Sequence, residues 1–390
     1  MTDDGQAPAR GMSRDERLEE TIPDPQTMVP LTGKPGSGRR VDDQAFVQRI
    51  DAMIEECGGD VGTFEGKLIR DQITTSLKLI YDKRGTGELK LLTAAFKELR
   101  YAYQVFERYE EQPRISIFGS ARTAEDHPDF ESCVVFSKRM ADAGWLCITG
   151  AGDGIMKAGH LGPGAASSFG LSIRLPFEQS TNSVIAGNEK LINFRYFFTR
   201  KLMFISQCDA VAVYPGGFGT QDELFEALTL VQTGRSGIVP IVLLEHEGGD
   251  YWKHWENYVR RSLLGYKMIS PEDLNLFHVT RSVDDAVEHV QRFYRNYHSS
   301  RYVKNDLVIR LRKPLQAGDV DRLNEEFRSL VKTGKIVQRG AYDIETECRD
   351  LPRLAFTHTK HGFGLLRRMI DRINEFDTAN DTSLHPSEIY

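Results

Sequence analysis

A glycine-rich turn between a predicted strand and a predicted helix is the part of the sequence best suited to chemistry. Residues 209–214 form an apolar run, and residues 220–233 have the pattern of a helix. The turn contains Gly216, Gly217 and Gly219, which let the backbone approach an anion closely, and Thr220, whose hydroxyl lies at the helix start. Because N–H groups at a helix N-terminus carry partial positive charge, the turn predicts a phosphate site. The competing interpretation is a tight turn without a ligand.

Two further glycine-rich turns also follow predicted strands. Residues 114–118 lead into Gly119-Ser120-Ala121-Arg122, and residues 145–149 lead into Gly150-Ala151-Gly152-Asp153-Gly154. Since ligands of open α/β sheets bind beyond the carboxyl ends of the strands, we expect the three turns along one edge of a sheet. Three such turns at one edge favour a binding site over tight turns alone.

The turn at residues 150–154 invites comparison with the dinucleotide-binding fingerprint. Ile155 occupies the position of the third glycine of that motif. About 20 residues further on, where an NAD-binding protein presents an acidic residue to the ribose, the chain has Arg174. The sequence therefore disfavours NAD, and contact between Arg174 and the 2′-phosphate of NADP stays open.

Charged side chains flank the main glycine turn. Arg200 and Lys201 lie in a predicted helix, residues 197–204, which leads into the strand before the turn. Adjacent helical residues point about 100° apart, so at most one of the two faces a site fully. A guanidinium here could reach a ligand, whereas the alternative is a solvated helix face. Glu223 has a structural interpretation as well, because Thr220 and Glu223 match a capping box, in which the carboxylate bonds back to the helix start.

The elements that must position these residues form an α/β protein with additions at both ends. Strands alternating with helices predict a doubly wound parallel sheet, Rossmann-like, over residues 113–297. Apolar residues at helical spacing predict two or three helices before it, and two helices with three strands (307–311, 335–338 and 353–357) predict a small C-terminal α+β unit. The expected organisation is a disordered tail, a helical region, the α/β domain, the C-terminal unit and a loose tail, with bounds 1–42, 43–112, 113–297, 303–376 and 377–390.

Composition excludes several classes of function. A net charge of −6 argues against a chain that binds nucleic acid or a membrane surface as a whole. The five cysteines are scattered without a C-x-x-C pair, so we expect reduced thiols and no metal. No apolar run approaches the roughly 20 residues needed to cross a bilayer. We therefore expect a cytoplasmic protein.

The motifs at residues 200–223 resemble a known family. Arg200-Lys201, followed by Pro215-Gly216-Gly217-Phe218-Gly219-Thr220-Gln221-Asp222-Glu223, is similar to the paired signature of the LOG family, cytokinin riboside 5′-monophosphate phosphoribohydrolases once loosely labelled lysine decarboxylases. Every fixed position of P-G-G-x-G-T-x-x-E is matched. The turns at residues 119–120 and 150–156 are similar too, with Ala151 where many members have glycine. The resemblance covers roughly residues 113–296 and neither flank.

The resemblance implies roles for individual residues. Arg200 and Glu223 would be catalytic, and Lys201 would add positive field without direct contact. The residues implied to bind substrate, mainly its 5′-phosphate, are Ser120, Gly152, Gly216, Gly217, Gly219 and Thr220. This assignment is chemically coherent, because a carboxylate stabilises the oxocarbenium-like ribose formed when an N-glycosidic bond breaks.

The resemblance also implies an activity and an assembly. The expected reaction is hydrolysis of a nucleoside 5′-monophosphate to free base and ribose 5-phosphate, without a cofactor, by a homodimer or higher homo-oligomer. With both flanks present, the chain is more similar to the larger bacterial nucleosidases, which act on AMP, GMP or pyrimidine monophosphates, than to the compact cytokinin-activating members. Aromatic residues near Phe194, Tyr196 and Phe197 either stack on the base or belong to the core.

Two other functions compete with hydrolysis. A carrier similar to the molybdenum cofactor carriers would keep the glycine turns, but it would not need Arg200 and Glu223. Lysine decarboxylation would require a pyridoxal phosphate Schiff-base lysine, for which only Lys201 offers itself. For the C-terminal unit, its separation from the motifs predicts a regulatory or oligomer-forming role.

Overall fold

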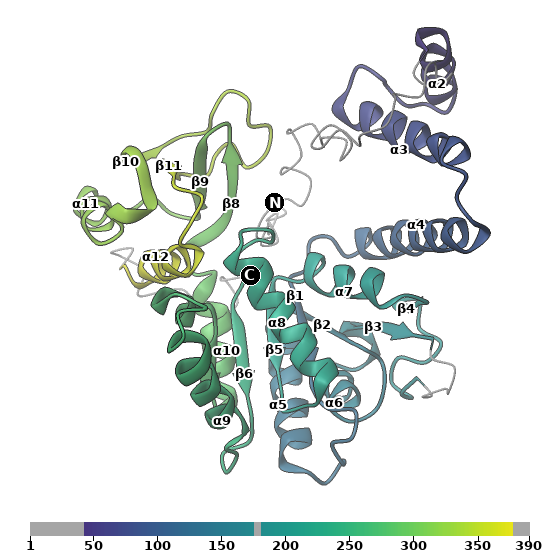
Figure 1. Ribbon diagram of the computed structural model, residues 1–390. Helices are drawn as coiled ribbons and strands as arrows, with labels where there is room; N and C mark the ends of the chain where they lie inside the picture. Colours follow the sequence, from purple (N-terminus) through teal and green to yellow (C-terminus); the bar gives the residue numbers. More distant parts are fainter. Residues whose placement is uncertain (1–42, 175–180, 377–390) are drawn as a thin grey trace, which may run out of the picture. The chain divides into compact units, whose positions relative to one another are not determined.

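The computed structural model describes residues 43–174 and 181–376 (Figure 1). The described chain divides into two compact units, residues 43–96 and residues 97–376. Both predicted tails, 1–42 and 377–390, lie outside the described residues. Within the described ranges, none of the helices is both long and apolar enough to cross a membrane.

A seven-stranded parallel sheet forms the centre of the larger unit. The strand order is β4-β3-β2-β1-β5-β6-β7, so the chain starts in the middle and winds outward in both directions. The strands are β1 (Arg114–Phe118), β2 (Leu146–Thr149), β3 (Ser168–Ile173), β4 (Leu191–Phe194), β5 (Ala210–Val213), β6 (Ile241–Leu244) and β7 (His278–Thr280). The predicted doubly wound Rossmann-like fold is confirmed, and the three-residue β7 is the strand that its short, mixed sequence did not reveal.

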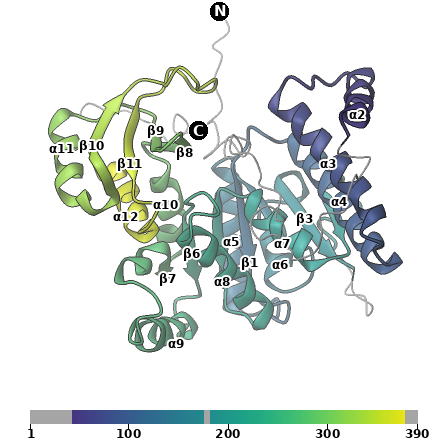
Figure 2. The same cartoon turned by 45° about the horizontal axis from the view of Figure 1, so that its top comes forward.

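Helices cover both faces of this sheet (Figure 2). One face packs on α5 (Pro128–Asp142), α6 (Ile155–Leu161) and α10 (Val283–Phe293), which share an apolar cluster with Ile115 and Ile117 of β1. Val211 and Val213 of β5 point to the other face, where they join a second cluster with α7 (Phe197–Ser206) and α8 (Phe218–Gln232). Alternate residues of a strand point to opposite faces, so strands covered on both sides are apolar throughout.

Shorter helices follow β6. They are α9 (Tyr251–Tyr258), a π-helical turn at Val259–Leu264 and a 3-10 helix at Pro271–Leu276. A capping box between Ser270 and Asp273 closes the start of the 3-10 helix.

A second, antiparallel sheet contains the C-terminal part of the unit. Its strand order is β10-β11-β9-β8, with strands at Tyr297–Val303 (β8), Asp306–Leu311 (β9), Val331–Arg339 (β10) and Arg353–His358 (β11), and with helices α11 (Ala317–Glu326) and α12 (Phe363–Glu375). The polar run at residues 298–301 concealed β8 from the sequence analysis. The helix predicted at 319–331 ends at Glu326, because a 3-10 turn and then β10 occupy its last residues.

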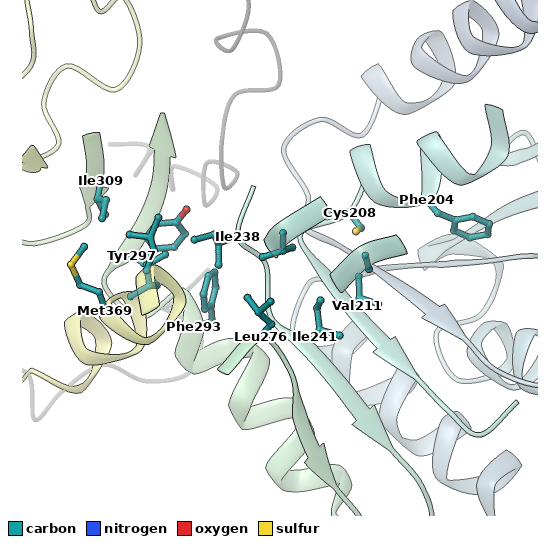
Figure 3. Packing of buried hydrophobic residues seen from close by; sticks show 14 of the residues in the cluster. Phe204, Cys208, Val211, Ile238, Ile241, Leu276, Phe293, Tyr297, Ile309 and Met369 are labelled. Carbon is teal, nitrogen blue, oxygen red and sulfur yellow. The ribbon is translucent and has the colours of Figure 1, made fainter. Parts of the chain in front are cut away.

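One apolar cluster joins the two sheets. Figure 3 shows buried side chains running from Val211 and Ile241 of the parallel sheet through Leu276 and Phe293 to Met369 of α12. At the end of α8, the ring of Phe363 lies against Gly234, where an added Cβ would come within 2.1 Å of it. The C-terminal sheet and the parallel sheet therefore share their interior.

Three helices precede the parallel sheet in the described chain, as predicted. They are α2 (Gln44–Glu56), α3 (Phe64–Tyr81) and α4 (Thr86–Glu107). Thr63 caps α3 by accepting a hydrogen bond from the Gly66 N–H at 3.1 Å. Ala102, Val105 and Phe106 of α4 belong to the main apolar cluster of the larger unit.

Candidate active site

A cavity of about 890 Å³ lies beyond the carboxyl ends of β1, β2 and β5. It is large enough for a nucleotide-sized ligand. Its wall includes residues from all three glycine turns and from α7, α8 and α9, namely Ile117, Phe118, Gly119, Ser120, Ala121, Arg122, Gly150, Met156, Phe197, Arg200, Phe204, Gly216, Gly217, Phe218, Gly219, Thr220, Gln221, Asp222, Glu223 and Tyr251. The three turns thus meet at one site.

The main glycine turn forms the start of α8. Gly217 is the N-cap, and a Cβ added at Gly217 or Gly219 would meet nothing within 4 Å, so both backbones are open to a ligand. Position 216 requires glycine for a different reason, because a Cβ there would lie 2.1 Å from the Thr220 hydroxyl. Its carbonyl accepts a hydrogen bond from the Tyr251 hydroxyl at 2.5 Å.

The structure does not form the capping box that residues 220–223 suggested. The helix begins at Phe218, two residues earlier than predicted, so Thr220 is already in its first turn. Glycines and an aromatic residue at 217–219 are weak helix formers, and this concealed the true start. Glu223 therefore does not close the helix start, and its side chain lines the cavity.

Backbone hydrogen bonds join the turn at residues 119–122 to both of the other turns. The Ser120 N–H donates to the Pro215 carbonyl at 3.1 Å, and the Ser120 carbonyl accepts from the Ile155 N–H at 3.0 Å. Gly154 has a φ of 61°, and a Cβ there would lie 2.3 Å from the Ser120 oxygen, so only glycine fits. Ile155, at the third glycine position of the dinucleotide fingerprint, packs on Gly119, where a Cβ would lie 2.6 Å from its side chain.

Arg200 extends from α7 into the cavity. Its guanidinium lies over the rings of Phe197 and Phe204, 5.8 Å and 5.3 Å from their centroids. Gly150 lies beside it, and a Cβ added there would come within 2.5 Å of Met156 Sδ and 3.4 Å of Arg200 Nη2. Burial lowers the pKa of Arg200 and the nearby Glu223 raises it; an arginine remains a cation in proteins. Its Nε has no hydrogen-bond partner among the described residues.

Glu223 is a buried carboxylate in the same cavity. Glu223 is only 6% exposed, and its Oε2 has no hydrogen-bond partner in the described structure. Burial raises the pKa of Glu223 to about 7, against the opposing charges of Lys201 and Arg200. A carboxyl group with this pKa can exchange a proton with a ligand at neutral pH.

Comparison with known proteins identifies the central segment. Residues 151–290 match the model of a family described as possible lysine decarboxylase, which is the LOG-type domain. None of the curated proteins matches the chain.

Several solved structures are similar to part of the chain. The molybdenum cofactor binding protein of Rippkaea orientalis is 19% identical over 45% of this chain and 94% of its own, with a TM-score of 0.33. The molybdenum cofactor carrier protein of Chlamydomonas reinhardtii is 20% identical over 46% of this chain and 97% of its own, with a TM-score of 0.34. DNA processing protein A of Helicobacter pylori is 12% identical over 47% of this chain and 81% of its own, with a TM-score of 0.33. At these values the likeness does not extend to function.

Two predicted site residues of the LOG domain do not line the cavity. Lys201 forms ion pairs with Asp222 at 3.0 Å and Glu226 at 2.5 Å, on the neighbouring helix α8. The carbonyl of Gly152 accepts a hydrogen bond from Asn182 at 3.0 Å, and Gly150 lines the cavity instead.

The structure brings the remaining predicted site residues together at the cavity. Ser120, Arg200, Glu223 and the glycine turn all line the cavity. Of the aromatic residues considered for base stacking, Phe194 is fully buried in the core, whereas Phe197 lines the cavity and is 55% exposed. Tyr196 stacks on Phe198 with ring centroids 5.6 Å apart.

The cavity wall also contains residues that the sequence analysis did not select. Arg122 is a second arginine in the wall, and its N–H donates to the Ser120 hydroxyl at 3.1 Å. Its place two residues after Ser120 was a signal that could have been used. Phe218, the variable position of the glycine motif, is 97% exposed at the cavity. Tyr251 comes from α9, and nothing in the sequence connected it with the glycine turn.

Proposed function

We propose that the protein hydrolyses the N-glycosidic bond of a nucleoside 5′-monophosphate. The substrate is AMP or another purine or pyrimidine nucleotide, with a cytokinin ribotide as a further candidate, and the products are the free base and ribose 5-phosphate. The observation that carries the proposal is Glu223, a buried carboxylate whose pKa is raised to about 7, in one cavity with Arg200 and the glycine turn.

The proposed binding mode places the phosphate at the start of α8. Amides of Gly216, Gly217, Gly219 and Thr220, together with the Ser120 hydroxyl, would hold its oxygens. Among the other residues in the proposal, Gly152 supports the turn at residues 150–154, and Lys201 contributes positive field from outside the cavity. With the phosphate at α8, Glu223 lies one helical turn from Thr220 and faces the ribose.

The proposed reaction begins with ionised Glu223. As the bond between C1′ and the base nitrogen breaks, its electron pair leaves with the base, and the carboxylate stabilises the positive charge that develops on the ribose. A water molecule attacks C1′ and gives a proton to Glu223, while the departing base takes up a proton from solvent; Glu223 then returns its proton to solvent. Arg200 binds ribose or phosphate oxygens and keeps the substrate against Glu223.

A panel of nucleotides tests this proposal. Purified protein is incubated with AMP, GMP, CMP, UMP and isopentenyladenosine monophosphate, and free base is measured by chromatography. We expect release from at least one of them, and the corresponding nucleosides without phosphate should be much poorer substrates. A folded protein that releases base from none of the five would refute the proposal.

Variants of the two proposed catalytic residues should lose activity. We expect Glu223→Gln and Arg200→Gln each to lower kcat by about 10²-fold or more, as for other preorganised charges. Glu226→Gln is the matched control, because Glu226 lies on the same helix and outside the cavity wall. Since Glu226 pairs with Lys201, its loss should change the pH dependence more than the limiting kcat. Activities of Glu223→Gln and Glu226→Gln that fall equally would assign the loss to helix α8 in general.

The competing function is a carrier that binds a phosphorylated ligand without cleaving it. The buried carboxylate of Glu223, whose Oε2 has no hydrogen-bond partner among the described residues, favours the enzyme, since in a carrier it would only repel the phosphorylated ligand. Tight nucleotide binding that persists in Glu223→Ala, with no turnover by the unmodified protein, would decide for the carrier. The family description as a lysine decarboxylase finds little support, because both ion pairs of Lys201 hold its amino group on α8.

Self-association and location complete the proposal. We expect a homodimer or higher homo-oligomer, and three apolar side chains of α7, Phe197, Phe198 and Leu202, are 55%, 51% and 45% exposed. Light scattering of the protein and of Leu202→Glu tests this, with a smaller particle expected for the variant. The five cysteines are all thiols, which agrees with the proposed cytoplasmic location.

A further inference from the structure

Two histidines and an aspartate meet at a place separate from the cavity. His127 and Asp129 lie at the start of α5, and His246 lies 117 residues away, just after β6. One ligand atom from each residue lies within 4.8 Å of those of the other two. None of the three belongs to the cavity wall described above. The fold thus gathers two imidazoles and a carboxylate that the sequence keeps far apart.

The interatomic distances are close to those between ligands of one metal ion. Nδ1 of His246 lies 2.9 Å from Asp129 Oδ1, and Nδ1 of His127 lies 3.6 Å from Asp129 Oδ2. Ligands bound to one ion at about 2.1 Å are roughly 3.0–3.5 Å apart in octahedral or tetrahedral geometry. Nδ1 of His127 accepts the backbone N–H of Asp129 at 3.1 Å and so caps α5. The His127 side chain is 45% exposed, so the ring has room to rotate and to offer either nitrogen to an ion.

Asp129 is a buried carboxylate that pairs with no lysine or arginine in the described chain. Asp129 is 5% exposed, and its ion-pair partners in the described chain are His127 and His246, with no lysine or arginine among them. Oδ1 accepts the His246 N–H at 2.7 Å, whereas Oδ2 accepts no hydrogen bond from any described residue. A bound cation would therefore supply positive charge beside this buried carboxylate.

We propose that His127, Asp129 and His246 bind a divalent transition-metal ion of the zinc class. Two imidazoles and one carboxylate suit Zn²⁺, Co²⁺ or Ni²⁺ rather than Mg²⁺ or Ca²⁺, which prefer oxygen ligands. The side chains of His127 and His246 are 45% and 30% exposed, so water completes the coordination. Binding displaces the proton between His246 and Asp129, because the metal takes the nitrogen lone pair.

Such an ion would stiffen the segment that supports the glycine turn. His246 is followed by a short loop to Tyr251, whose N–H donates to Glu245 at 2.8 Å and whose hydroxyl donates to the Gly216 carbonyl. A metal joining α5 to His246 therefore fixes one end of this connection. The metal site itself does not depend on which reaction the cavity performs.

Metal titration of the full-length protein tests the proposal. The protein, without a histidine tag, is stripped with a chelator, dialysed and titrated with ZnCl₂ by calorimetry and with CoCl₂ by visible absorption. We expect one equivalent to bind, with a d–d band for Co²⁺. His127→Ala and His246→Ala should each weaken binding by about tenfold or more.

His254→Ala is the matched control. His254 also lies near a carboxylate, Asp250 at 3.2 Å, but this exposed pair has no third ligand, so its loss should leave the affinity unchanged. Thermal melting adds a second readout, because Zn²⁺ should raise the Tm of the parent and of His254→Ala more than that of His127→Ala. Absence of saturable binding to the folded parent, or equal affinity in the parent, His127→Ala and His246→Ala, would overturn the proposal.

Discussion

Glu223 combines two properties that usually exclude each other in a folded protein. It is ionisable, and it is buried with an oxygen that no described residue bonds. Burying such a group costs stability unless it is paired, so its presence at a cavity wall is typical of a functional residue. Its proton equilibrium should therefore be visible in both activity and stability.

The proposed reaction should lose rate below neutral pH. Since Glu223 must be ionised and its pKa is about 7, kcat/KM should fall by about tenfold for each pH unit below that value. The substrate phosphate itself loses a proton at about pH 6, so the pH profile is also measured for Glu223→Gln, which keeps the substrate ionisation and should lack the limb of Glu223. A limb centred near pH 4.5, or an identical limb in the variant, would contradict the assignment.

Stability should respond to the same group in the opposite sense to activity. The folded protein holds the Glu223 proton up to pH 7, whereas the unfolded chain loses it near 4.5, so folding carries a cost that is complete above pH 7. Glu223→Gln should thus stabilise the protein by up to about 3 kcal/mol at pH 8 and by under about 1 kcal/mol at pH 5. Urea unfolding at both pH values measures this, and a gain that is independent of pH would speak against a raised pKa.

At the scale of elements, α7 and α8 divide the charges of the site between them. Lys201 on α7 pairs with Asp222 and Glu226 on α8, and the same helices direct Arg200 and Glu223 into the cavity. Lys201 thereby lowers the pKa of Glu223 from outside the cavity wall. Its effect on catalysis should be one of pH dependence rather than of substrate contact.

Replacement of Lys201 tests this division. Lys201→Gln removes a positive charge near Glu223, so the acidic limb of kcat/KM should move to higher pH by roughly half to one unit. The rate at high pH should change far less than in Arg200→Gln. Lys201→Arg keeps the charge and should keep the limb in place; a limb that moves equally in both variants would indicate altered packing of α7 on α8.

The sequence predicted these elements well where a local pattern specifies them. Apolar runs ending at glycine turns predicted β1, β2 and β5, and the family motif predicted that Arg200 and Glu223 share a site. The start of α8 was wrong by two residues, because glycines hide a helix boundary. The polar strand β8 and the cluster of His127, Asp129 and His246 depend on contacts between distant segments, and no local pattern reveals them.

At the scale of the whole molecule, the C-terminal sheet shares its interior with the parallel sheet. The apolar cluster includes Leu276, Phe293 and Tyr297 at the junction, and Ile309 and Met369 beyond it (Figure 3). A chain that ended before Tyr297 would expose this junction, so we expect truncation to unfold the α/β domain. A regulatory role for the C-terminal unit, proposed from sequence, would therefore act within one cooperative structure.

Met369→Ala tests this cooperativity. Met369 is fully buried, so the variant should lose about 2–4 kcal/mol of unfolding free energy. All three tryptophans, Trp145, Trp252 and Trp255, lie outside the C-terminal unit, so their fluorescence reports on the α/β domain alone. The urea midpoint measured by tryptophan fluorescence should fall together with the midpoint measured by circular dichroism. Arg368→Ala is the control, since Arg368 is exposed and its loss should change the midpoint little. An unchanged fluorescence midpoint would show that the two sheets unfold separately.

The contact between Phe363 and Gly234 gives helix α8 a second use. The helix is about 22 Å long, and the glycine turn forms its first residues. The ring of Phe363, from α12, packs against Gly234, just past the other end of the helix. Because a helix is stiff along its axis, a displacement at one end of α8 also moves its other end. Anything that displaces α12, whether a bound effector or a neighbouring subunit, would consequently shift the amides at the start of α8, where the proposed phosphate site lies.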